Sequence, residues 1–155
     1  MESETVLKKY KFGFEPWGLF LFIIIMIPNF FWFIFPPRED VLITDSATKI
    51  IDVIGSVFQV LMIATLCTLK NKESKKIRLT PCIIITAVCY LLYITAWIFY
   101  YCGITGKSII LVLTLAPCLA FLFFAIDRKN RIAIIPVSVF TLFHLVYGVV
   151  NFVIR

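Results

Sequence analysis

Apolar residues along the chain fall into five long runs that short polar stretches separate. The runs cover about residues 17–35, 50–69, 81–101, 108–126 and 132–154. A helix that crosses the hydrocarbon core of a bilayer needs roughly 20 mostly apolar residues. Strands of a membrane barrel would be shorter and would alternate in polarity. The pattern therefore predicts an all-α, polytopic membrane protein built as a bundle of five transmembrane helices.

The composition agrees with this prediction. The chain has 155 residues, and 61% of them are hydrophobic. A soluble domain of this size leaves too much surface exposed to hide that many apolar side chains. The polar stretches between the runs are too short to hold a folded soluble domain, so we expect residues 1–155 to form a single membrane domain.

The net charge of +6 is distributed unevenly. Three basic residues precede the first run, five lie between the second and third, and three lie between the fourth and fifth, so eleven of the 15 share one side. The positive-inside rule then predicts a cytoplasmic N-terminus and an external C-terminus. We expect a multi-pass protein of the cell (plasma) membrane whose basic loops attract anionic lipid headgroups. No module for nucleic-acid binding is visible in the sequence.

Prolines and polar residues mark the ends of the predicted helices. The first helix should stop at Pro36-Pro37, because proline lacks a backbone donor and clashes with the preceding turn. The charged residues 38–40 are expected to hold that end in water, and Glu15 is expected to be a solvated residue at the helix start. Asp45, Ser46 and Thr48 are candidate N-caps for the second helix, and Thr80-Pro81 has the sequence of a capped start to the third.

Polar side chains recur at helical spacing in three of the helices. Asp52, Ser56 and Gln59 share one face of the second helix, and similar stripes of hydroxyl, aromatic and amide residues run along the third and fifth. Polar faces of membrane helices point toward protein or water, so helices 2, 3 and 5 should meet in the centre. The fourth helix is rich in Phe and Leu and is expected to face lipid or a partner subunit.

Depth gathers the polar groups of four helices into one layer. At about 1.5 Å per residue, they all lie roughly 5–15 Å from the predicted outer surface. A bend at Pro28 would turn Asn29 toward this layer. The layer predicts an outward-facing pocket with His144 and Gln59 as its floor. Its walls are predicted to be Asn29, Asp52, Tyr93, Trp97 and Tyr147.

Three classes of function fit this pattern. The first is binding or transport of a small amphiphilic or cationic ligand, with the aromatic rings providing contact and Asp52 providing charge. The second is a non-catalytic accessory, immunity or sensor protein that binds another membrane protein or a further copy of itself. The third is an intramembrane enzyme that uses Ser56, His144 and Asp52, but no glycine-flanked serine motif supports it. With one histidine and no carboxylate cluster, we expect no metal and no cofactor.

Overall fold

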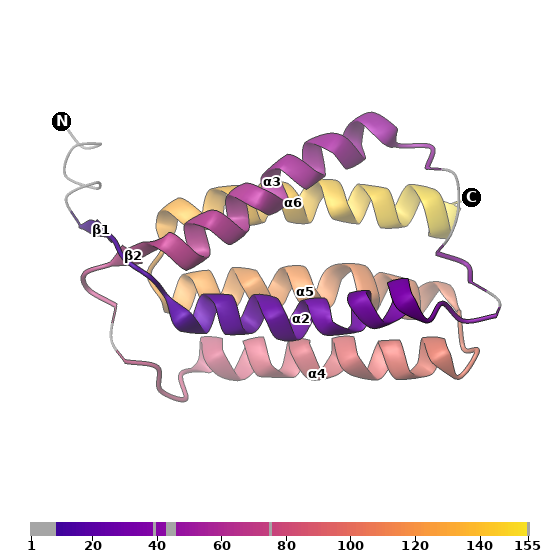
Figure 1. The fold of residues 1–155 in the computed structure, drawn as a ribbon, viewed down its shortest axis with the longest axis horizontal. Coiled ribbons are helices and arrows are strands. Elements are labelled where there is room, and N and C mark those ends of the chain that lie inside the picture. The colour runs from indigo at the N-terminus through magenta and orange to yellow at the C-terminus, as the bar shows by residue number, and fades with distance from the viewer. Residues whose placement is uncertain (1–8, 39, 43–45, 75, 155) are drawn as a thin grey trace.

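The computed structural model describes residues 9–38, 40–42, 46–74 and 76–154. Within these ranges the chain forms five long helices that run side by side (Figure 1). They are α2 (Pro16–Ile34), α3 (Lys49–Thr68), α4 (Pro81–Tyr101), α5 (Lys107–Asp127) and α6 (Arg131–Gly148), and α6 continues as the π-helical segment η1 (Val149–Ile154). Each is long and apolar enough to cross a membrane. Their ends lie within one residue of those that the sequence predicts.

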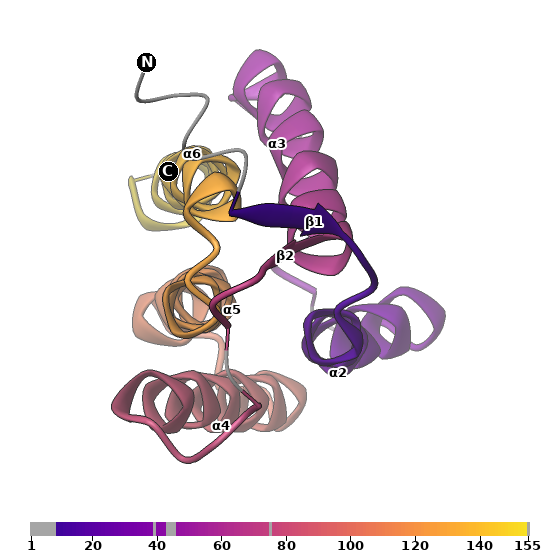
Figure 2. The ribbon, with the colours of Figure 1, turned by 90° about the vertical axis from the view of Figure 1, so that its left-hand side faces the viewer.

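Two short strands, which the sequence analysis did not predict, cross one end of the bundle. β1 (Tyr10–Phe12) pairs antiparallel with β2 (Leu69–Asn71), and Tyr10 lies opposite Asn71. Figure 2 shows the pair lying across the ends of the helices. We call this the basic end, because the lysine- and arginine-rich segments 69–74, 76–80 and 128–131 lie there, and we call the opposite end the far end. Strands of three residues are too short for their alternation to stand out in the sequence.

α5 lies between α4 and α6 and is largely covered by protein, which contradicts the expectation that the fourth predicted helix faces lipid or a partner subunit. It packs against both α4 and α6 and is the most buried of the five helices. Small side chains let its neighbours approach closely, as membrane helix interfaces require. They include Ala116, Cys118, Ala120 and Ala125, all of which are buried. The prediction failed because a helix with few polar residues packs as well against protein as against lipid.

α6, α5 and α4 lie in a row, and α3 and α2 lie on one side of it. α3 packs chiefly along α6, α4 packs chiefly on α5, and α2 closes the remaining side (Figure 2). The second and fifth predicted helices therefore do meet, whereas the third reaches the centre through side chains rather than by packing on α3. α2 approaches α3 closely at Gly18, where a Cβ would lie 2.8 Å from the carbonyl oxygen of Leu66. Only glycine fits there without a shift of the backbone.

Side chains cap two of the helices. The hydroxyl of Thr80 accepts a hydrogen bond from the Ile83 amide at the start of α4, as predicted. The Asn130 side chain accepts one from Ala133 at the start of α6. Thr48 occupies the N-cap position of α3, but its hydroxyl bonds Asp52 and not a backbone amide. The third candidate cap for α3, Asp45, lies outside the described residues.

The segment after α2 folds back onto the bundle, so Asp40 does not project into water as expected. Its carboxylate accepts hydrogen bonds from the Trp32 indole (2.7 Å), the Leu42 amide (2.9 Å) and the Tyr100 hydroxyl (2.5 Å). These donors come from α2, the loop itself and the end of α4. Asp40 thus ties α2, α4 and the loop together at the far end.

Candidate functional site

Three cavities inside the bundle share lining residues and meet at His144. The first, about 280 Å³, lies between α3 and α6. The second and third, about 160 Å³ each, lie among side chains of α2, α4, α5 and α6, with Gln59 of α3 reaching the second, and the third extends toward the far end. His144 lines all three. We call them together the central cavities.

The seven side chains that the sequence predicts to form a pocket all line the central cavities. Asp52 and Tyr147 line the first cavity. Asn29 and Tyr93 line both the second and the third, and Trp97 lines the third. Gln59 lies between the first and second cavities, and His144 belongs to all three. Helical spacing thus placed these seven residues along the same cavities, and their use as an outward-facing ligand site stays a prediction.

Asn29 links α2 to α4 across the cavities. Its amide nitrogen donates to the Tyr93 hydroxyl at 2.7 Å and to the Ile25 carbonyl one turn earlier at 3.1 Å. Asn29 directly follows the intrahelical Pro28. The amide thus faces inward, as the sequence analysis expected, and it fixes the position of the Tyr93 hydroxyl.

Trp97 provides an aromatic wall with a polar edge. The residue is 6% exposed, and its ring contacts those of Tyr93, Tyr100 and Trp32 at centroid distances of 6.3, 5.6 and 6.5 Å. Its indole N–H is buried and makes no hydrogen bond of normal geometry in the described part of the chain, although the Tyr93 hydroxyl lies close to it. A buried donor without a partner is unfavourable by about 1–3 kcal/mol, and an acceptor inside the cavity would remove that penalty.

His144 lies between two aromatic rings of its own helix. It stacks on Phe140 at 5.1 Å, with an interplanar angle of 18°, and on Tyr147 at 6.1 Å, with an angle of 14°. The i, i+3 and i+4 spacing of α6 places these three rings on one face. No hydrogen bond joins the imidazole to any residue among 9–38, 40–42, 46–74 and 76–154. The imidazole thus lines all three central cavities without a protein hydrogen-bond partner among those residues.

Asp52 holds a structural role beside the first cavity. Its carboxylate accepts hydrogen bonds from the hydroxyls of Ser46 and Thr48, the latter at 2.9 Å. The Asn151 amide donates to Thr48 at 2.9 Å and accepts from the Ala47 amide at 2.8 Å, so it connects η1 to the start of α3. Asp52 also lies in the first turn of α3, where the helix dipole favours a carboxylate. Its charge is thus compensated by the protein.

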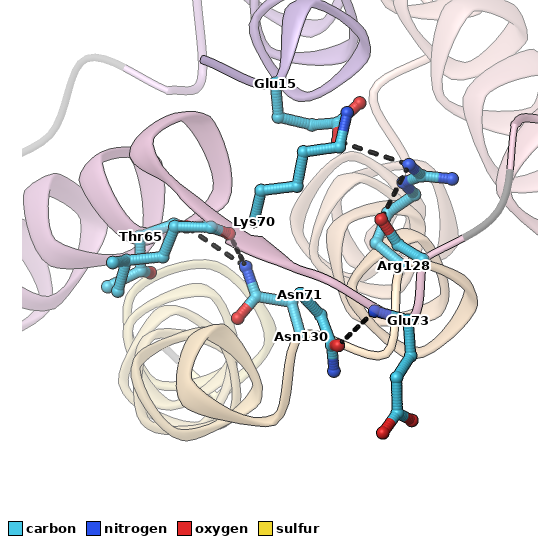
Figure 3. A network of polar contacts seen from close by, with 9 residues as sticks. Glu15, Thr65, Lys70, Asn71, Glu73, Arg128 and Asn130 are labelled. Atoms are coloured by element: carbon cyan, nitrogen blue, oxygen red, sulfur yellow. Dashed lines mark hydrogen bonds and ion pairs between the residues drawn. The ribbon is translucent and has the colours of Figure 1, made fainter. Parts of the chain in front are cut away.

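The basic end contains a polar network that sequence reasoning missed (Figure 3). Glu15 is 3% exposed and forms ion pairs with Arg128 at 3.2 Å and with Lys70 at 3.4 Å, so it is not the solvated residue that was expected. Asn130 donates to the carbonyls of Thr65 and Leu69. The network joins the start of α2 to the end of α3 and to the α5–α6 turn. The one signal for this network in the sequence was Glu15 itself, an acidic residue that follows several lysines and directly precedes a helix.

These features define the class of the molecule. It is an all-helical bundle in which five helices are long and apolar enough to span a membrane, and this suggests a multi-pass membrane protein. Comparison with protein-family models, with curated proteins and with solved structures finds no match for the chain. Within the described residues, no three His, Cys, Asp or Glu side chains are grouped so that they could hold a metal ion. The function must therefore be argued from the central cavities themselves.

Proposed function

We propose that the chain is a multi-pass protein of the cell membrane, with its basic end in the cytoplasm, and that its central cavities bind a small amphiphilic molecule. The convergence of three cavities on His144 carries this proposal. Structural polar groups in a membrane bundle normally bond to neighbouring helices. His144 and Trp97 instead line the cavities, and neither the imidazole nor the indole N–H makes a hydrogen bond of normal geometry in the described chain, which leaves them available to a ligand.

The lining favours a neutral ligand over a cation. Aromatic rings of Trp97, Phe140 and Tyr147 form much of the walls. Asp52 is the one carboxylate that lines the central cavities within the described chain, and two hydroxyls already compensate it. The available polar groups are an indole donor, an imidazole and the Gln59 amide. A planar molecule with a hydrogen-bond acceptor fits this set.

Binding of such a molecule is the step that a transporter and a sensor have in common. The cavities are at or below the lower end of the range for ligand sites, roughly 300–1,000 Å³, so we expect a small ligand and not a whole lipid. Ligands of this size are matched by aromatic contact and a few oriented polar groups. Benzamide and benzamidinium make suitable probes, because they have the same shape and differ in charge and in the presence of a carbonyl acceptor.

Tryptophan fluorescence can test the proposal on the purified full-length protein in mild detergent. A Trp17→Phe/Trp32→Phe variant leaves Trp97 as the reporter, and a Trp32→Phe/Trp97→Phe variant leaves Trp17, which lines none of the central cavities. We expect benzamide to change the Trp97 emission saturably and to leave the Trp17 emission unchanged, whereas benzamidinium affects neither. Equal responses of the two reporters, or no saturable response of Trp97, would contradict the proposal.

A further inference from the structure

A larger cavity lies at the basic end, away from the central cavities. It measures about 420 Å³. β1 and β2 and the segment after them form one side, and the α5–α6 turn with the adjoining helix ends forms the other. The lining residues that matter here are Lys9, Tyr10, Glu73, Ile126, Lys129 and Arg131. We call this cavity the basic-end pocket.

Positive charge exceeds negative charge in the basic-end pocket. Lys9 forms an exposed ion pair with Glu73 at 3.1 Å. The side chains of Lys129 and Arg131 are exposed and have no hydrogen bond or ion pair with residues that the structure describes. The hydrogen bond from Lys9 lowers the pKa of Glu73 below its ordinary value, and the charges of Lys129 and Arg131 lower the pKa further. The three cations therefore converge on the same space.

The backbone holds Lys129 in a conformation that favours glycine. Its φ angle is 52°, in the left-handed region that ends many helices and where glycine is the usual residue. The Tyr10 hydroxyl donates to the Lys129 carbonyl at 3.2 Å and accepts from the Arg131 amide at 2.9 Å, and the Asn71 side chain also donates to that carbonyl. A lysine thus occupies a position where glycine would relieve strain, and contacts from β1 and β2 secure it.

The pocket also has an apolar side. Ile126 of α5 and Ile134 of α6 line it next to the cationic groups. Ile126 is 42% exposed, so the apolar side of the pocket is open to the outside of the bundle. Lysine and arginine beside exposed apolar side chains at the cytoplasmic boundary match the two parts of an anionic lipid, its phosphate and its acyl chains.

We propose that the basic-end pocket binds the phosphate group of an anionic membrane lipid, with the acyl chains lying against Ile126 and Ile134. The proposal rests on insertion of the five helices in a membrane and is independent of ligand binding at His144. Phosphatidylglycerol provides the probe, because phosphatidylcholine with the same acyl chains carries the same phosphate without a net charge.

The test measures lipid binding to the delipidated, detergent-purified full chain by native mass spectrometry. Dioleoylphosphatidylglycerol is titrated against the wild type, a Lys129→Gly/Arg131→Gln variant and a Lys11→Gln control, whose exposed lysine lies on β1 outside the pocket. We expect the double variant to bind at least tenfold more weakly while Lys129→Gly alone leaves the melting temperature unchanged or higher. Lys11→Gln should change the affinity less than twofold.

Three results would overturn the proposal. If Lys11→Gln weakens binding as much as the double variant does, the lipid adsorbs to general positive charge. If dioleoylphosphatidylcholine binds as tightly as phosphatidylglycerol, the lipid charge is not recognised. If inorganic phosphate displaces phosphatidylglycerol at equal concentration, the acyl chains contribute nothing and the site is a free-anion site.

Discussion

Glu15 connects the start of α2 to the end of α3 and to the α5–α6 turn at the basic end. Its carboxylate contacts Arg128 and Lys70, and its backbone amide donates to the Cys67 carbonyl at 2.8 Å. The side chains of Glu15 and Arg128 are 4% and 7% exposed, so their ion pair is screened little by water. Removing one partner of a buried pair leaves the other charge poorly compensated.

We therefore predict that Glu15→Gln lowers the free energy of unfolding by about 3–5 kcal/mol, the range for a broken buried pair. Glu73→Gln is the matched control, because its ion pair with Lys9 is about half exposed and should matter little for stability. Chemical denaturation in detergent would measure both variants. Equal stabilities of the two variants would show that the Glu15 pair does not hold the basic end.

Individual residues differ in how far the sequence reveals them. The inward positions of Asn29, Gln59 and His144 were predicted, because helical spacing alone places polar residues on one face. The pairing of Glu15 with Arg128 could not be predicted, because the two residues are 113 positions apart and meet only after the bundle has formed. The compensation of Asp52 by Ser46 and Thr48 was also missed, although all three are close in sequence.

For α5, the apolar sequence predicts the length and the ends of the helix but not its place in the bundle. Its length and ends were predicted well, because hydrocarbon thickness, Gly106 and the polar residues after Ile126 determine them. Its place in the bundle was predicted wrongly, because lipid and a neighbouring helix are equally apolar surroundings. The informative signal was the spacing of small residues such as Ala116 and Ala120, which permits close packing.

The contacts of α2 and α3 lead to a prediction about two glycines. Gly18→Ala would place a Cβ 2.8 Å from the backbone oxygen of Leu66, which cannot move without shifting α3. We expect a loss of about 1–3 kcal/mol in the free energy of unfolding, as for other overpacked sites. Gly55→Ala is the control, since its Cβ would lie 3.5 Å from Phe143, an ordinary contact, and alanine favours helix. A Gly18→Ala protein as stable as Gly55→Ala would mean that the two helices do not approach this closely.

The whole molecule has an asymmetric distribution of charge that predicts its orientation. The start of the described chain, segments 69–74 and 76–80 and the α5–α6 turn lie together at one end, so those of the grouped basic residues that the structure describes do share a side (Figure 1). Two helices separate each basic segment from the next, so the chain returns to the same end of the bundle each time. The cytoplasmic location of that end remains a prediction from the positive-inside rule.

Thiol labelling in intact cells tests the orientation. Cys102 is exposed at the far end and can serve as a native reporter once the other four cysteines are replaced. Lys76→Cys, in a background that lacks Cys102, provides the matched reporter at the basic end. We predict that a membrane-impermeant maleimide labels Cys102 directly and labels position 76 only after permeabilisation. The reverse pattern would place the basic end outside.

The central claim is that His144 belongs to a ligand site inside a membrane bundle, and the affinity for benzamide tests it most directly. His144 and Leu142 lie on one helix, His144 on the cavity side and Leu142 59% exposed on the outer side. Loss of one buried hydrogen bond is worth about 1–3 kcal/mol, so His144→Ala should weaken benzamide binding about fivefold or more. Leu142→Ala should leave it unchanged, with both variants folded. Equal affinities of His144→Ala and the wild type would contradict the account.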